Sequence, residues 1–390
     1  MAILPYPRAV HAAKQLQDGT HRTRTLDETW RAFGRLAPRA GITRLAELTG
    51  LDTLGIPVFA AIRPMGKSLS TQQGKGTSPL AAKVSALMES LETFSAESII
   101  APIVHGSYHA LRARRTVVDV RRLARAKPRL DLRARWPWLL GQDLDGADVL
   151  VPRDAVTLDC TFRTPPVFDI SSNGLASGNV RVEAIVHGLL EVIERDAEAA
   201  WRRAGGDRRL VLDTITDRSC LVLIERIVRA GSRVVVWDLT SELGIPVIGC
   251  AIVEDPREPA WRPLGVYQGF GAHLCPEIAI ARAITEAAQT RLTYIAGGRD
   301  DFFPEDYARA TDPALCAALW ARVTSPCDEP VAFDDLPATR TADLHDDLAA
   351  LRIALDDRDV IVVDLTHPTL GVPVVKVIVP GLATDVNVMG

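Results

Sequence analysis

The chain has 390 residues, a formal net charge of −4, 47% hydrophobic residues and 24% charged residues, which is the composition of an ordinary globular protein. The slightly acidic balance gives no support for nucleic-acid binding, and the absence of an 18-residue apolar run gives none for a membrane span. Six scattered cysteines without a Cys-x-x-Cys pair, and a start without a signal-peptide pattern, predict a cytoplasmic location with neither a disulfide framework nor a zinc site.

The first half of the chain alternates short helices and strands. The patterns predict a helix at 26–36, a strand at 56–62 and a helix at 78–97. The Gly74–Gly76 segment breaks the chain before the second of these helices. Residues 105–165, rich in Arg, Pro and Asp, are predicted to form strands and loops.

The second half begins with a small-residue turn, 172–179, that opens a helix at about 180–203. Strands are predicted at 234–239 and 247–253, a helix at 276–296 and an irregular acidic stretch at 300–345. A helix at 341–355 leads into strands at 360–365 and 372–379. This order lacks a strict βαβ rhythm, so we expect an α/β fold with mixed sheets. The apolar strand at 372–379 could serve an interface as well as the core, so the sequence leaves open whether the chain forms a homodimer.

A narrow acidic stripe runs along the central helix. Glu183, Glu191 and Glu194 fall within about 40° of His187, and apolar residues cover most of the remaining circumference. A solvated helix face is usually broad and of mixed charge. Carboxylates on a largely buried helix need a cation or a shifted pKa. The stripe therefore predicts a functional site in which these carboxylates meet a cation or have shifted pKa values.

The same polar spacing, i, i+4, i+7, occurs on three predicted helices. The triads are Ser85, Glu89 and Glu92, then His187, Glu191 and Glu194, then Arg282, Glu286 and Gln289. The first two triads are separated by 102 residues at every position. One such stripe is most simply read as an exposed helix face, but three with the same spacing favour a shared site.

Four carboxylates brought together would repel one another, and a divalent cation relieves that repulsion. Glu89, Glu92, Glu191 and Glu194 offer only oxygen ligands, which suit Mg²⁺ rather than zinc. Mg²⁺ usually keeps positions open for phosphate oxygens, so a nucleotide is the expected companion. Candidate phosphate contacts are Arg282, Arg22 and Arg202, whereas Arg291 lies about 180° round its helix from Arg282.

Other motifs are weak. Residues 74–76 lack the spacing of a Walker A loop, and the chain has no Gly-x-Ser-x-Gly elbow. His187 is as readily a satisfied, half-buried histidine as a ligand contact. The cysteines at 160, 220, 250 and 275 lie in apolar or turn contexts and are expected to be inert.

These motifs resemble the YcaO family. The likeness rests on Gly74–Gly76 with the Ser85 triad, on residues 172–179 with Glu191-x-x-Glu194-Arg195-Asp196, and on the segment 285–293. It spans roughly residues 55–385, so we expect a catalytic domain at 55–390 after a helical and extended segment at 1–54. The stretches Gly19–Arg22 and Gly41–Arg44 resemble the subgroup associated with TfuA proteins.

The resemblance implies an ATP- and Mg²⁺-dependent enzyme that activates a peptide backbone amide by phosphorylating the amide oxygen. By position, Glu89, Glu92, Glu191 and Glu194 would hold Mg²⁺, and Glu191 and Glu194 would be catalytic. Ser85, Glu89, His187, Glu191 and Glu286 would line the nucleotide. Arg22 and Arg282 would contact phosphate. His187 stands where the family often has Gln.

The nucleophile decides the product, and three remain open: a side chain gives an azoline, a sulfide equivalent a thioamide and a backbone amide an amidine. Azoline-forming members commonly end in a Pro-rich tail, whereas this chain ends Val386-Asn387-Val388-Met389-Gly390 and has no spare length for a fused leader-binding domain. We therefore expect thioamide formation on a peptide or protein, with a TfuA-type partner and a sulfur donor. A non-catalytic nucleotide-binding scaffold and a plain acidic metal-binding protein are the alternatives from other classes.

Overall fold

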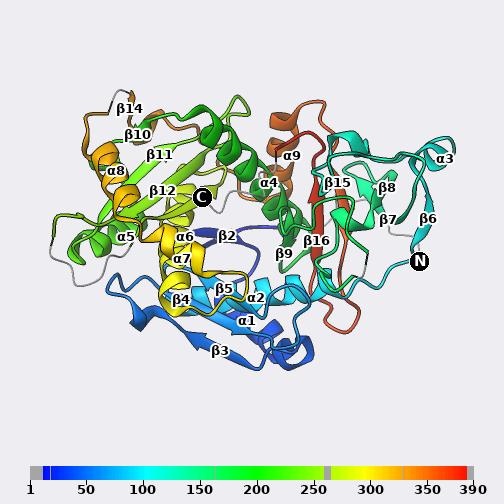
Figure 1. Cartoon of the computed structure of the whole chain (residues 1–390), viewed down its shortest axis with the longest axis horizontal. Coiled ribbons are helices and arrows are strands. Elements are labelled where there is room, and N and C mark those ends of the chain that lie inside the picture. Colours follow the sequence, from blue (N-terminus) through cyan, green and yellow to red (C-terminus); the bar gives the residue numbers. More distant parts are fainter. Residues whose placement is uncertain (1–11, 18, 163, 259–264, 328, 384–390) are drawn as a thin grey trace.

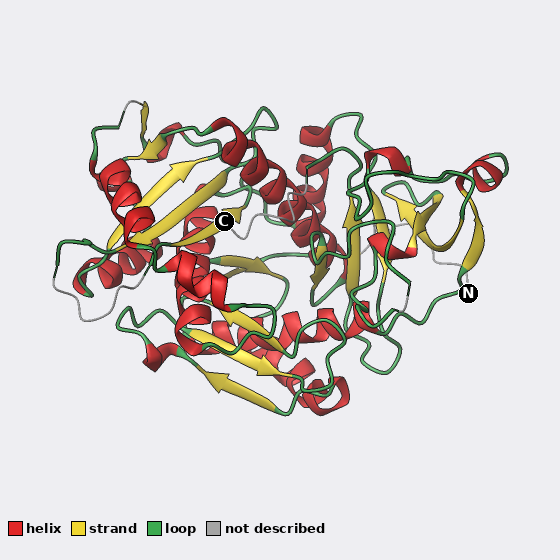
Figure 2. Cartoon of the chain, in the orientation of Figure 1, coloured by secondary structure: helices red, strands yellow, loops and turns green. Residues whose placement is uncertain are grey.

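A computed structural model describes residues 12–17, 19–162, 164–258, 265–327 and 329–383. The C-terminal sequence on which the tail argument depends lies outside these residues. The described part combines helices with several small sheets (Figure 2), so the predicted mixed α/β architecture is confirmed. Within the described residues, every helix is too short or too polar to cross a membrane.

The described strands form four sheets (Figure 1). The five-stranded sheet has the order β13 (Tyr267–Ala272), β12 (Val247–Val253), β11 (Arg233–Asp238), β10 (Arg208–Leu210) and β14 (Glu329–Val331). The six-stranded sheet has the order β6 (Val104–Ser107), β7 (Arg135–Asp143), β15 (Ile361–Asp364), β16 (Val374–Ile378) and β9 (Leu175–Ser177), with β8 (Asp148–Pro152) beside β7.

The two smaller sheets come from the N-terminal part of the chain. One consists of β3 (Arg44–Glu47), β4 (Val58–Ile62) and β5 (Thr71–Lys75), and the other of β1 (Gln15–Gln17) and β2 (Thr20–Arg22). Strand β3 precedes the expected domain boundary after residue 54, and its antiparallel partner β4 follows it. The boundary itself stays a prediction.

The described helices cover the sheets and separate them. They are α1 (Leu26–Phe33), α2 (Pro79–Glu97), α3 (Tyr108–Arg112), α4 (Arg181–Ala204), α5 (Arg218–Arg229), α6 (Pro276–Ala296), α7 (Pro304–Ala310), α8 (Pro313–Thr324) and α9 (Leu344–Leu355). Helix α4 passes between the two large sheets and packs against strands of both (Figure 1). Helix α2 packs on β4 and β5, and α6 packs on β12 and β13.

Three strand–helix units repeat along the chain. Strand β5 leads into α2, β9 into α4 and β13 into α6. The strands end at Lys75, Ser177 and Ala272, spacings of 102 and 95 residues, and each helix begins four residues later. The three polar triads therefore occupy equivalent positions on equivalent helices.

Glycines let strand and helix approach closely within these units. A Cβ at Gly74 would lie 1.9 Å from the backbone nitrogen of Ala86, and one at Gly269 would lie 2.1 Å from that of Ala287. No side chain fits at such distances. The glycines thus set the depth at which α2 and α6 lie against their strands.

Some predicted elements were wrong. Residues 300–345 are not irregular, because they contain α7, α8 and β14. The Gly74–Gly76 break and the 172–179 turn are partly strand, belonging to β5 and β9. Helix α1 ends at Phe33, and a 3₁₀ segment with Pro38 inside it follows. These segments are short, so local apolar periodicity identified them poorly.

Candidate active site

The triad faces of α2, α4 and α6 each contact the strand of another unit. Glu92 accepts a hydrogen bond from the backbone N–H of Ser177 in β9, with 2.5 Å between Oε2 and the nitrogen. Glu194 accepts one from Ala272 at the end of β13, at 2.8 Å. Gln289 donates to the carbonyl oxygen of Gln73 in β5, at 3.0 Å. The three units therefore close into a ring with the triads inside it.

The acidic residues at the centre of this ring hold their protons unusually tightly. Burial raises the pKa of Glu191 to about 7. Burial, with the added repulsion of Glu89 and Glu191, raises the pKa of Glu92 well above its ordinary range. Burial also raises the pKa of Glu194. Burial by the surrounding protein likewise raises the pKa of Glu89 to about 7, against the opposing charges of Lys75 and Arg299.

Basic side chains neutralise one part of the cluster. The Lys75 ammonium lies 2.6 Å from Oε2 of Glu286, and a guanidinium nitrogen of Arg195 lies 3.4 Å from Oε1 of the same carboxylate. Burial alone would raise the pKa of Glu286, but Lys75 and Arg195 outweigh it and hold this pKa well below its ordinary range. Arg195 also lies 3.1 Å from Glu194.

A second basic side chain, Arg282 of α6, borders the cluster on the side of α4. Arg282 lies 3.5 Å from Nε2 of His187 and 3.8 Å from a carboxylate oxygen of Glu194. Its Nε is buried and has no hydrogen-bond partner among the described residues. Burial, together with Arg22 and Arg282, lowers the pKa of His187 well below its ordinary range. His187 is therefore neutral and can accept a hydrogen bond.

Most, but not all, of the residues predicted from the sequence gather here. Ser85 lies on α2 one turn before Glu89, and Arg22 lies on β2 with a guanidinium nitrogen 3.7 Å from Glu183. Arg202 instead pairs with Glu198 on its own helix, at 2.9 Å. Arg291 faces away and is buried between Asp52 and Glu254, with 2.8 Å to a carboxylate oxygen of each.

Three residues of this site carried no role in the sequence analysis. Lys75 and Arg195 hold Glu286, and Lys376 on β16 lies buried near Glu191, where burial lowers its pKa to about 8. Lys75 follows a glycine at a strand end, and Arg195 directly follows Glu194, so both occurred within the motifs. The position of Lys376 near Glu191 could not be predicted, because the pattern of a strand does not indicate which distant helix its side chains face.

The donor set of this site fits Mg²⁺ and a phosphate group. Glu89, Glu92 and Glu191 are carboxylates whose pKa values are raised chiefly by burial, so each gains from a cation that balances its charge. A hard divalent cation takes such oxygen ligands. The unpartnered Nε of Arg282 is a buried donor that a phosphate oxygen can satisfy.

Comparison with known families agrees with this chemistry. A family model described as the YcaO cyclodehydratase, ATP- and Mg²⁺-binding, matches residues 73–383. The chain belongs to the YcaO family. This YcaO chain is thus a member of an ATP-dependent family with ATP and Mg²⁺ as its cofactors. The match contains all three strand–helix units except the first two residues of β5.

Relatives and solved structures extend the match over most of the YcaO chain. An uncharacterized protein in the tfuA 3′ region of Rhizobium leguminosarum bv. trifolii is 38% identical, covering 89% of this chain and 85% of the relative. An uncharacterized protein of Methanothermobacter thermautotrophicus is 37% identical, covering 91% and 93%.

Among solved structures, YcaO from Methanopyrus kandleri bound with AMPPCP and Mg²⁺ aligns with a TM-score of 0.76 and 26% identity, covering 96% of this chain and 95% of that one. A heterocyclase in complex with substrate and cofactor aligns with a TM-score of 0.80 and 22% identity. It covers 98% of this chain, which spans 55% of the heterocyclase, and at that identity it shows the fold alone.

Proposed function

We propose that this YcaO enzyme forms a thioamide in a peptide or protein backbone, with ATP as the phosphate donor and a TfuA-type protein as its partner. The main support for this proposal is the ring of three strand–helix units. This ring gathers four carboxylates beside Arg282, namely those of Glu89, Glu92, Glu191 and Glu194. The position of the Rhizobium relative in a tfuA region supports the choice of partner and, with it, of sulfur as the nucleophile.

The charge of each residue determines its proposed role in binding Mg²⁺ or the nucleotide. Glu89, Glu92, Glu191 and Glu194 would hold Mg²⁺, which supplies charge neutralisation at phosphate oxygens. Arg282 would bind phosphate through its free Nε, and Arg22 would lie at the same side on β2. Ser85, His187 and Glu286 would line the nucleotide. In this arrangement Lys75 and Arg195 keep Glu286 ionised and fixed.

The overall reaction replaces one oxygen by one sulfur. Hydrosulfide adds to the amide carbon, the amide oxygen takes the γ-phosphoryl group of ATP, and the C–O bond then breaks with phosphate as the leaving group. An amide oxygen is a poor leaving group, and phosphorylation makes it a good one. The protein contributes mainly by positioning and by charge stabilisation, which dominate catalysis of phosphoryl transfer.

The test is a mass measurement on a defined peptide. The full chain is incubated with ATP, Mg²⁺, sulfide, a TfuA-type protein and a candidate substrate peptide. We expect a mass gain equal to the exchange of oxygen for sulfur, dependent on all three small molecules. Loss of water from the peptide would instead establish azoline or amidine formation and contradict the thioamide proposal.

Matched variants separate catalysis from presentation of the peptide. Glu191→Gln removes one proposed Mg²⁺ ligand with little change of shape, whereas Glu225→Gln on α5 changes an exposed carboxylate paired with Arg229 at 2.6 Å. We expect the first variant to abolish product and the second to keep it. Product formation that survives Glu191→Gln while nucleotide binding is lost would favour a non-catalytic scaffold.

A further inference from the structure

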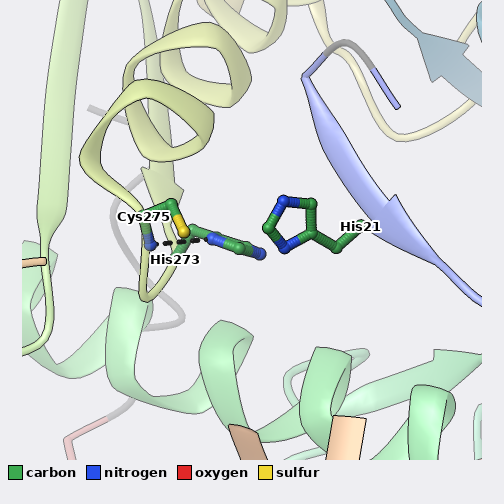
Figure 3. Close-up of side chains that lie close together, drawn as sticks. All are labelled: His21, His273 and Cys275. Carbon is green, nitrogen blue, oxygen red and sulfur yellow. Dashed lines mark hydrogen bonds between the residues drawn. The ribbon is translucent and has the colours of Figure 1, made fainter. Parts of the chain in front are cut away.

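We propose that His21, His273 and Cys275 form a second metal site, specific for a divalent transition metal of the zinc class. One ligand atom from each residue lies within 4.8 Å of the other two. His21 comes from β2, His273 follows β13, and Cys275 is the residue before the first turn of α6 (Figure 3). None of the three ligands belongs to the carboxylate cluster, and this site is inferred without reference to the proposed reaction.

The donor types determine the class of metal. Two imidazole nitrogens and one thiol sulfur are borderline to soft ligands, which suit Zn²⁺ and not Mg²⁺. A neutral imidazole offers the lone pair of one ring nitrogen to a metal. A bound divalent metal would also deprotonate the Cys275 thiol, as coordinating thiols lose their proton.

His273 departs from the residue type that the other two units of the repeat carry at its position. The equivalent residues in the first two units are Gly76 and Gly178, where a Cβ would lie 2.9 Å from the nitrogen of Ala82 and 2.7 Å from that of Ala184. In the third unit this position carries a large, buried imidazole instead. A departure from the repeat at the residue that meets His21 and Cys275 is best explained by a local role.

His21 has an unsatisfied atom directed at the same place. Its Nδ1 is buried and has no hydrogen-bond partner among the described residues. The rings of His21 and His273 meet edge to face, with 5.0 Å between their centroids, and the nitrogen of His273 that is not bonded to Cys275 points toward His21 (Figure 3). A metal ion between the rings would satisfy this buried nitrogen.

Metal binding would replace two existing hydrogen bonds by bonds from the ligands to the metal. The backbone N–H of Cys275 donates to Nδ1 of His273 at 2.9 Å, and the Cys275 thiol donates to the carbonyl oxygen of Thr339 at 3.6 Å. Coordination through the other nitrogen of His273 requires Nδ1 to carry the proton, so the first bond is lost. Single hydrogen bonds contribute little compared with the coordination of a transition metal by three ligands.

Three protein ligands leave one coordination position open. A small cavity of about 20 Å³ adjoins the cluster, and its lining includes His21, His273, Asp347, His187 and Arg282. That volume holds about one water molecule. Open fourth positions are typical of zinc sites that bind an exogenous ligand. We therefore assign the open position to a water or a small anion on the side that faces Arg282.

Cobalt provides a spectroscopic test that does not depend on activity. The full chain is stripped with a chelator, supplied with excess Mg²⁺ to fill carboxylate sites, and titrated with Co²⁺. We expect one equivalent to produce the strong visible bands of a tetrahedral site and a near-ultraviolet thiolate-to-cobalt band, and Zn²⁺ to abolish both. Cys275→Ser should remove the thiolate band, and His273→Gln should weaken Co²⁺ binding by about tenfold or more.

Cys220→Ser is the matched control. Its thiol is likewise buried and donates to a backbone carbonyl, that of Glu277, at 3.2 Å. This variant should keep both sets of bands. Absence of the thiolate band in the unchanged chain, or its persistence in Cys275→Ser, would overturn the proposal. Circular dichroism checks folding, and if Cys275→Ser is unfolded, His21→Gln on the β1–β2 hairpin decides by the loss or retention of the tetrahedral bands.

Discussion

At the scale of single residues, the position of each arginine determines what it does. Arg195 is about one-third exposed and lies among Glu194, Glu198 and Glu286, where it adjusts the charge of the candidate site. Arg291, on α6, is 1% exposed and is held between two carboxylates away from that site. The first arginine thus lies in the candidate site, whereas the second is part of a buried ion-pair network that we expect to stabilise the fold.

Arg291→Met should destabilise the protein strongly. Asp52 and Glu254 would keep their charge without the buried partner, and breaking a buried pair in this way costs about 3–5 kcal/mol. Arg229→Met on α5 removes an exposed pair and should cost no more than about 1 kcal/mol. Urea unfolding measures both free energies. Equal, small losses would contradict the structural role of Arg291.

Stabilisation by Mg²⁺ should grow as the pH rises. The pKa of Glu191 is raised from 4.5 to about 7, so the folded metal-free protein holds a proton that the unfolded chain releases. The resulting stabilisation is present below about pH 4.5 and is lost as the pH rises through about 7. Mg²⁺ must displace such protons, so it competes poorly at low pH.

Melting temperatures with and without Mg²⁺ test this linkage. We expect a small increase at about pH 5.5 and a larger one at about pH 8. Glu191→Gln should reduce the pH dependence, whereas the exposed-site variant Glu225→Gln should not. An increase of the same size at both pH values would contradict the assignment of Mg²⁺ to these carboxylates.

At the scale of elements, close packing of strand and helix fixes where the triads lie. Gly74→Ala should therefore destabilise the fold, because its Cβ would lie 1.9 Å from a backbone nitrogen of α2. Overpacking of this kind costs about 1–3 kcal/mol or more. Gly50→Ala is the control, since nothing lies within 4 Å of its added Cβ. If Gly74→Ala unfolds at the same urea concentration as the unchanged chain, the close approach is not needed.

The helices that carry the triads were predicted from the sequence because their ends have strong local signals. Ser78 caps α2 by accepting a hydrogen bond from Ala81, Pro79 begins the helix, and Gly297 ends α6 in the left-handed conformation. Helices α7 and α8 were not predicted, because they are short and lie in an acidic stretch without a clear apolar periodicity. Tertiary packing on α6 and β12, rather than local sequence, determines β13, which was also missed.

At the scale of the whole molecule, three repeated units surround one cluster of charge. The repeat could be predicted from the triads, since their spacing is local. The contacts that close the ring could not, because Glu92 meets Ser177 and Glu194 meets Ala272 across 85 and 78 residues. Such pairings depend on the packing of all three units. The His21–His273–Cys275 cluster was missed for the same reason.

Calorimetry of AMPPCP binding tests directly whether the triads of α2, α4 and α6 form one Mg²⁺–nucleotide site. The titration is done with Mg²⁺ and with a chelator, on the unchanged chain and on Glu92→Gln, Glu191→Gln and Glu225→Gln. We predict binding that requires Mg²⁺, that weakens about tenfold or more in the first two variants and that is unchanged in the third. Equal binding in the presence of the chelator, or unaltered affinity in both Glu92→Gln and Glu191→Gln, would contradict it.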